Sequence, residues 1–250
     1  YIISRTDRNI FVSKSQLDFY VKRFKLNPVK QRVVYNGISF SKIKDVFDKK
    51  AIDELQGEQN IKKELNLSPD TLLLSSVGNF IPVRDQMTLC RFANLLKKQG
   101  VDFQLLLIGK RLDFVASQYD DCVSYCREND LLNHVSFLGM RTDVPQILAQ
   151  SDAFLYATDY DTFGIAVAEA MATGIPVFVN DWEVMSEITV HGKYATLYKT
   201  KDERDLVKKF MLFLKHKNDY ISKAQLAQQF VRETYNIESH ISNLMQQYEF

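Results

Sequence analysis

Five short, almost uninterrupted apolar segments constrain the fold of this chain more than any other feature. Stretches with helical periodicity separate them. Such runs predict strands that are covered on both faces, and their alternation with helices predicts parallel β-α-β units. The crossover connections of such units are right-handed. We therefore expect an α/β fold, a Rossmann-like doubly wound parallel sheet with helices on both faces. The strands are predicted at residues 72–77, 103–108, 135–138, 153–156 and 175–179, and the helices at 86–98, 115–129, 144–149 and from 164 onward.

The two ends of the chain show other patterns. Residues 9–13 predict a strand, 14–24 a helix, and 32–38 a strand that enters an Asn-Gly-Ile turn. From Asp202 to the end, the sequence predicts a helical C-terminal tail.

Composition and charge are those of a globular protein without a nucleic-acid partner. The 250 residues, 46% of them hydrophobic, suffice for one sizeable domain with extra elements. A net charge of +1 gives no electrostatic reason to expect nucleic acid. No apolar run approaches the roughly 20 residues of a membrane span, and we expect a cytoplasmic protein. The three cysteines are odd in number, and two of them lie four residues apart on a predicted helix, so they are expected to be core thiols rather than a disulfide framework.

Glu169 is the only charged residue between positions 162 and 180. An ionised carboxylate in such an apolar segment is costly unless it is hydrogen-bonded or borders a ligand cavity. A helix that begins at Gly164 and stops before Gly174-Ile-Pro176 directs this side chain back toward its own N-terminus.

Residues 161–164 follow a predicted strand, at the edge where open α/β sheets bind ligands. The amides at a helix N-terminus suit phosphate groups or sugar hydroxyls. Asp161 and Glu169 are therefore expected to face one ligand. The simpler alternative for Asp161 is a helix cap at Phe163 or Gly164.

The spacing Asp161-x7-Glu169, followed by Ala-Met-Ala-Thr-Gly-Ile-Pro-Val, resembles the signature of retaining GT-B glycosyltransferases of group 1 (family 4). In that signature two acidic residues stand in this spacing. Here aspartate occupies the first position, where the family usually has glutamate, so the carboxylate is kept but is one methylene shorter.

Two further loops extend the resemblance. Gly78-Asn-Phe-Ile-Pro-Val-Arg84 is similar to the family's Gly-Arg-x4-Lys loop, whose two cations grip the donor diphosphate. Arg84 keeps the second charge and adds a planar fork for phosphate oxygens, whereas Asn79 replaces the first cation and can still donate hydrogen bonds. Residues 135–144 resemble the strand and loop that receive the base through backbone groups.

The resemblance implies the C-terminal half of a GT-B fold. Residues 1–38 are expected to be a remnant of the N-terminal acceptor domain with the linker, and residues 39–250 the nucleotide-sugar (donor) binding domain with C-terminal helices. We expect the chain to be a fragment that, alone, is inactive or weakly active.

The implied activity is transfer of a sugar from a UDP-, GDP- or ADP-linked donor to an acceptor hydroxyl with retention, in bacterial polysaccharide or glycolipid synthesis. The acceptor, a saccharide or lipid-linked sugar, would be bound through the missing domain. Peripheral contact with the cytoplasmic face of the inner membrane is expected of the full-length protein only. No metal or other cofactor is expected, although Asp159-Tyr-Asp161 is a near match to a metal-binding Asp-x-Asp motif.

The resemblance also implies a role for each site residue. Asp161 would contact the donor sugar and Arg84 the diphosphate, and these two are the predicted catalytic residues. Glu169 would accept hydrogen bonds from the ribose. The residues predicted to bind the nucleotide sugar are Gly78, Asn79, Arg84, Gly139, Met140, Arg141, Thr162, Phe163, Gly164, Ile165 and Glu169.

Other interpretations stay open at this point. A non-catalytic nucleotide-sugar-binding or assembly module and a GT-B nucleotide-sugar epimerase are the alternatives, although the sequence displays no histidine in a catalytic context for the epimerase. A dehydrogenase is disfavoured because no Gly-x-Gly-x-x-Gly follows a strand. Glu187 matches a commonly acidic family position and is interpreted as structural.

Overall fold

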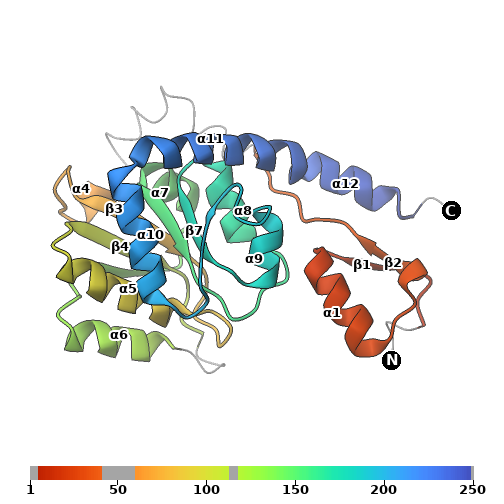
Figure 1. Ribbon diagram of the computed structural model, residues 1–250, viewed down its shortest axis with the longest axis horizontal. Coiled ribbons are helices and arrows are strands. Elements are labelled where there is room, and N and C mark those ends of the chain that lie inside the picture. The colour runs from red at the N-terminus through yellow and green to blue at the C-terminus, as the bar shows by residue number, and fades with distance from the viewer. Residues whose placement is uncertain (1–4, 41–59, 113–117, 249–250) are drawn as a thin grey trace.

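The six-stranded sheet at the centre of the protein is parallel throughout, and helices cover both of its faces (Figure 1). The structure is a computed structural model that describes residues 5–40, 60–112 and 118–248. The spatial order of the strands is β5-β4-β3-β6-β7-β8. Their bounds are Leu72–Val77 (β3), Phe103–Ile108 (β4), Val135–Gly139 (β5), Ala153–Tyr156 (β6), Val177–Asn180 (β7) and Thr196–Tyr198 (β8).

The strand order reverses beside β3. The chain runs from β3 to β4 and β5 on one side and then crosses to β6 on the other side. Loops at the carboxyl ends of β3 and β6 therefore leave in opposite directions and open a crevice between them, which is where sheets of this kind bind ligands.

Alternate residues of each strand pack under different helices. In β3, Leu74 joins a core cluster with Leu89 and Phe92, whereas its neighbour Leu73 packs with Ile61 and Ile147 on the opposite face. The helices that cover the sheet are α4 (Ile61–Glu64), α5 (Gln86–Lys98), α6 (Tyr119–Glu128), α7 (Val144–Gln150), α8 (Ile165–Ala172), α9 (Glu183–Ile188), α10 (Glu203–Lys215) and α11 (Lys217–Thr234).

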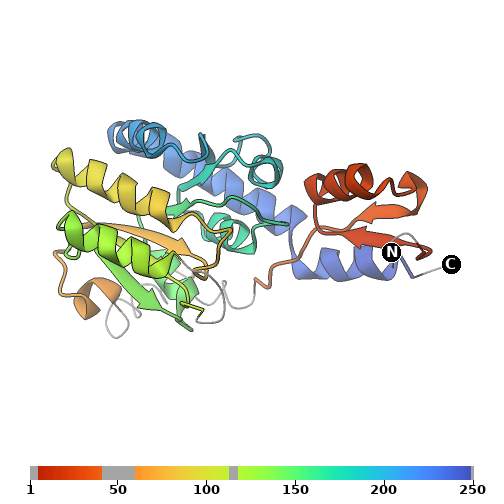
Figure 2. The ribbon, with the colours of Figure 1, turned by 90° about the horizontal axis from the view of Figure 1, so that it is seen from below.

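A smaller unit at one end of the molecule is built from the N-terminal residues (Figure 2). Strands β1 (Asn9–Phe11) and β2 (Gln31–Val33) pair in parallel, and helix α1 (Lys14–Phe24) with the short 3-10 helix η1 (Pro28–Lys30) connects them. The last helix, α12 (Ile237–Met245), lies beside these strands rather than on the large sheet.

Specific contacts join the C-terminal helix to the N-terminal segment. Ile38 bridges to Asn236, and the His240 ring nitrogen Nδ1 lies 2.7 Å from the Tyr35 carbonyl oxygen. Gly37 is required here because a Cβ would meet the Ile237 Cα at 2.6 Å.

Glu187 connects the two units from α9. Its carboxylate accepts hydrogen bonds from the Lys14 and Ser15 amides, both at 2.7 Å, and from the Tyr35 hydroxyl at 2.9 Å. Burial and the hydrogen bond to Glu187 raise the pKa of Tyr35 to about 12. These contacts agree with the structural role predicted for Glu187.

The doubly wound sheet and the helical C-terminal tail are confirmed. Strand β2 ends at Val33, earlier than predicted, because its partner β1 is short: Ser13 already caps α1 by accepting from the Gln16 amide. The predicted helix at 115–129 is observed from Tyr119, and residues 113–117 lie outside the described part. Residues 41–59, where the predicted donor-binding domain begins, also lie outside it.

The cysteines are buried and unpaired by disulfides, as predicted. Cys90 from α5 and Cys122 and Cys126 from α6 lie together in the core cluster on one face of the sheet.

Candidate functional site

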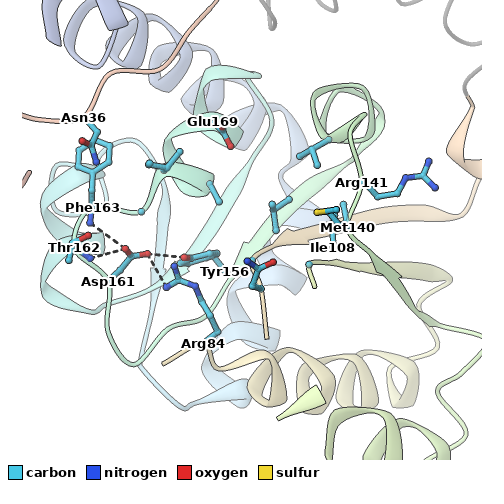
Figure 3. A pocket seen from close by; sticks show the side chains of 18 residues that line it. Asn36, Arg84, Ile108, Met140, Arg141, Tyr156, Asp161, Thr162, Phe163 and Glu169 are labelled. Carbon is cyan, nitrogen blue, oxygen red and sulfur yellow. Dashed lines mark hydrogen bonds and ion pairs between the residues drawn. The ribbon is translucent and has the colours of Figure 1, made fainter. Parts of the chain in front are cut away.

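A cavity of about 380 Å³ lies at the carboxyl ends of β3, β4 and β6 and at the start of α8 (Figure 3). It occupies the crevice that the strand order creates. Most of the predicted site residues line it, namely Gly78, Asn79, Arg84, Met140, Arg141, Asp161, Thr162, Phe163, Gly164, Ile165 and Glu169.

Asp161 lies at the centre of a hydrogen-bonded network. Its Oδ1 accepts from the amides of Thr162 at 2.7 Å and Phe163 at 3.3 Å. Its Oδ2 accepts from the Tyr156 hydroxyl at 2.8 Å and forms an ion pair with Arg84 Nη1 at 3.0 Å. A carboxylate offers about four lone-pair positions, so all of them are in use.

The cap predicted for Asp161 is thus partly correct. The side chain caps the turn that precedes α8 by accepting from the Phe163 amide. The helix N-cap itself is Gly164, which has no side chain to serve this purpose.

Arg84 reaches Asp161 from the loop between β3 and α5. Its Nη1 also donates to the Thr158 hydroxyl at 2.9 Å and to the Tyr160 carbonyl at 3.3 Å. The guanidinium carbon lies 5.2 Å from the centre of the Tyr156 ring, within the range of a cation–π contact. The cation predicted to hold phosphate therefore binds Asp161, Thr158 and Tyr160 through Nη1 in this structure.

The start of α8 supplies backbone donors. Gly164 has φ +86°, and a Cβ there would lie 2.7 Å from the Met185 Cε, so only glycine suits this turn. The first amides of α8, those of Ile165 and Ala166, have no acceptor within the helix, and both residues line the cavity.

Phe163 contributes through its backbone. Its ring is 1% exposed and packs between Tyr35 and Tyr235, with centroid distances of 6.2 and 5.2 Å. The packed ring therefore anchors the turn on the side away from the cavity, while the backbone of Phe163 faces the cavity.

Glu169 borders the cavity, as its isolation in the sequence suggested. It lies one helical turn after Ile165 on α8, is half-buried, and points from the helix toward the ring of lining side chains (Figure 3). Its place at the cavity wall accounts for a charged residue on an otherwise apolar helix.

The opposite wall carries residues whose polar groups have protein partners. Asn79 Oδ1 accepts from the Lys110 amide at 2.9 Å and so ties the loops after β3 and β4 together. Arg141 forms ion pairs with Glu64 and Asp143, both at 2.7 Å, and its guanidinium points away from the cavity in Figure 3. Hydrogen bonds to Asp143 and Glu64 raise the pKa of Arg141, and the bond from Arg141 lowers that of Asp143.

Gly139 is the predicted residue that does not line the cavity. It ends β5 with φ +65°, and its carbonyl accepts from the Gly109 amide at 2.9 Å. Gly109 lines the cavity instead, and its lack of a side chain is required because a Cβ would lie 2.0 Å from the Gly78 oxygen.

Sequence reasoning missed other lining residues, notably Asn36 and Tyr156. Asn36 comes from the N-terminal segment, far away in the chain. Tyr156 belongs to an apolar run that was interpreted only as a strand; its position at the strand's carboxyl end was the available signal.

The described residues contain neither a metal-binding cluster nor a helix that could span a membrane. No group of three or more His, Cys, Asp or Glu side chains there is arranged to hold a metal ion. No helix in the described ranges combines the length and the hydrophobicity needed to span a bilayer.

Curated relatives align with most of this chain. It is 27% identical over 183 residues to N-acetyl-alpha-D-glucosaminyl L-malate synthase of Bacillus anthracis, which covers 73% of this chain and 46% of that protein. It is 23% identical over 178 residues to UDP-Gal:alpha-D-GlcNAc-diphosphoundecaprenol alpha-1,3-galactosyltransferase of Escherichia coli, 70% of this chain and 43% of the relative. The chain thus spans less than half the length of these curated relatives.

Solved structures share the fold. The Anabaena protein HepE in complex with UDP and glucose superposes with a TM-score of 0.82 at 18% identity, over 97% of this chain and 63% of HepE. Within the chain, residues 57–236 match the family described as glycosyl transferases group 1. This match covers well over half of the sequence, and the chain belongs to the glycosyl transferases group 1 family.

Proposed function

We propose that this chain is the donor-binding half of a retaining glycosyltransferase that acts in bacterial polysaccharide or glycolipid synthesis. The observation that carries the proposal is the cavity itself. It gathers Arg84, Asp161, Glu169 and the first amides of α8 around one space at the switch point of the sheet. HepE, which shares this fold, was solved with UDP-glucose as well as with UDP.

Different groups in the cavity bind different parts of the donor. Glu169 accepts hydrogen bonds from the ribose hydroxyls. Arg84 and the amides at the start of α8 hold the diphosphate, where a helix N-terminus favours negative charge. Asp161 accepts a hydrogen bond from the donor sugar.

We propose that Arg84 also changes partners when the donor binds. All lone-pair positions of Asp161 are filled, and Arg84 fills one of them. When the diphosphate draws Arg84 away, Oδ2 gains room for a sugar hydroxyl. Binding of the phosphates thereby prepares the contact to the sugar.

Charge on the departing diphosphate is stabilised by Arg84 and backbone donors, so we propose that no metal is needed. The acceptor, a saccharide or lipid-linked sugar, is bound by an N-terminal domain, of which residues 1–38 are the last part. Closure of the two domains around both substrates then precedes transfer at the cytoplasmic face of the membrane.

A second candidate is a module that binds nucleotide sugar without transferring it. The exposed Asn79, at the position of an expected cation, favours this alternative because one charge for the leaving diphosphate is absent. An epimerase finds less support, since no histidine of the described residues lines the cavity.

Calorimetric titration tests the proposal. The chain is titrated with UDP, GDP, ADP and NAD, first with EDTA and then with Mg²⁺. We expect one nucleoside diphosphate to bind equally well under both conditions, which would also identify the base. Binding of NAD alone, or of none of the four, would refute the donor-domain assignment.

The two candidates are separated by activity. Transfer by the full-length protein supports the enzyme, and donor binding without transfer to any saccharide acceptor supports the module.

A further inference from the structure

Tyr156 ends strand β6 beneath the cavity, and none of the roles proposed above uses it. Its side chain is 2% exposed. The hydroxyl donates to Asp161 Oδ2 at 2.8 Å, and the ring lies below the Arg84 guanidinium, 5.2 Å from centroid to carbon. The residue therefore touches both members of the ion pair.

The position of the Tyr156 hydroxyl is fixed by the sheet. The strand pairs with β7 through Val179, and the backbone carbonyl of Tyr156 accepts from the Tyr198 hydroxyl at 2.7 Å. Phe154 stacks on the ring at a centroid distance of 6.1 Å. A side chain held this firmly presents its donor at one place.

The hydroxyl stays a donor over the pH range in which the protein would work. Burial raises the pKa of Tyr156 well above its usual value. Since an ionised carboxylate only accepts, the proton of this bond belongs to the tyrosine.

One oxygen of Asp161 depends on such a support. Its side chain is fixed at Oδ1 by the amides of its own turn, and the partners of Oδ2 within the described part of the chain are Arg84 and Tyr156. Once phosphate attracts Arg84, the tyrosine hydroxyl is the remaining bond among those described that holds Oδ2 in place.

We propose that Tyr156 is a positioning residue that holds the Asp161 carboxylate toward the donor sugar while Arg84 binds the diphosphate. The contact between Tyr156 and Asp161 is independent of the proposed function, whereas its consequence for the donor sugar rests on that function.

A stability cycle tests the contact without any ligand. Tyr156→Phe removes only the hydroxyl, and we expect it to lower the folding equilibrium constant about tenfold in urea titrations, since a hydrogen bond to a charged group is lost. In the Asp161→Asn background the same substitution should cost clearly less. Tyr235→Phe is the matched control, because it removes a buried hydroxyl that donates to the Ile188 carbonyl and touches neither Tyr156 nor Asp161, so its cost should be the same in both backgrounds. An equal cost of Tyr156→Phe in both backgrounds would overturn the contact.

Binding of nucleotide sugars tests the role. The readout is the ratio of affinities for a nucleotide sugar and for its nucleoside diphosphate, measured by calorimetry on the same chain. We expect Tyr156→Phe to leave the diphosphate affinity within about twofold and to lower the ratio about tenfold.

A second substitution separates positioning from general damage. Asp161→Glu restores the length of the family's carboxylate, so adding it to Tyr156→Phe should recover most of the lost ratio. An unchanged ratio in Tyr156→Phe, or an equal loss for diphosphate and nucleotide sugar, would overturn the proposed role. A wild-type chain that binds no nucleotide would refute the function proposed above and the role toward the sugar, while the stability cycle would still decide the contact.

Discussion

Replacing Asp161 by asparagine is expected to tighten the binding of a nucleoside diphosphate, although the substitution removes a side chain from the proposed site. The reason is the ion pair between Asp161 Oδ2 and Arg84 Nη1 at 3.0 Å. In the exchange of partners proposed above, the phosphates compete with this carboxylate for Arg84. Asparagine keeps an oxygen that can accept from the Thr162 and Phe163 amides, so the turn before α8 should survive.

The size of the gain follows from the burial of the pair. Unit charges about 4 Å apart interact by roughly 4 kcal/mol at an effective dielectric constant near 20. The net value is smaller because Arg84 and Asp161 keep 19% and 10% of their side-chain surfaces exposed, and because the two charges stay near each other after Arg84 moves. A pair of this kind contributes about 1 kcal/mol, which corresponds to a tightening of about fivefold.

Calorimetry at low and high salt measures this gain. The nucleoside diphosphate that binds the wild-type chain is titrated into Asp161→Asn, Arg84→Ala and the double variant. The gain should shrink at high salt and vanish in the Arg84→Ala background. With the nucleotide sugar it should be absent, since the sugar loses its acceptor. Weaker or unchanged diphosphate binding by Asp161→Asn, or a gain that persists without Arg84, would refute the exchange of partners.

Three further substitutions and one pH change test the remaining assignments. Arg84→Ala should weaken nucleoside diphosphate binding about tenfold in calorimetry, more at low salt. Glu169→Gln should weaken nucleoside diphosphate binding, whereas Asp161→Asn should tighten it, and the circular dichroism spectrum of Glu169→Gln should stay that of the wild-type chain. Unchanged affinity would exclude the ribose contact. Gly164→Ala should destabilise the fold by roughly 1–2 kcal/mol in urea titrations, since a residue with a Cβ pays about that much for left-handed backbone. The raised pKa of Tyr35 implies stability that is complete below pH 10 and declines as the pH rises toward about 12, and a Tyr35→Phe variant should show less of this decline.

The sheet was predictable because its strands are buried on both faces. Burial on both faces makes a strand apolar almost throughout, as in residues 103–108, which are all buried. The strand that escaped prediction is β8, with two of its three residues only partly buried, at the edge of the sheet. With only three residues, β8 has no apolar run long enough to distinguish it from a loop.

The location of the site was predictable for a related reason. In parallel sheets all carboxyl ends lie at one edge, so any residue just after a strand is a candidate. Asp161 follows β6, and Arg84 lies in the loop that follows β3. Glu169 was recognisable because nothing else on its helix is charged.

The partners of these residues were not predictable. Arg84 and Asp161 are 77 positions apart, and so are Arg141 and its partner Glu64. Such pairs depend on how the loops fold over the sheet edge. The periodicity of the sequence carries no information about these loop conformations. For this reason both arginines were expected to face the ligand, whereas Arg141 forms ion pairs with Glu64 and Asp143.

The charges around the cavity indicate how donor recognition is coupled. Among the described residues that line it, the two arginines are both paired with carboxylates, and Arg84 alone is paired with an acid of the site itself. In the function that we propose, phosphate binding and sugar binding therefore share one side chain. A monosaccharide without phosphate leaves Arg84 on Asp161, and a nucleoside without phosphate does the same. On this proposal, the contact to the sugar becomes favourable only as part of a complete nucleotide sugar, because the diphosphate is the component that releases Asp161.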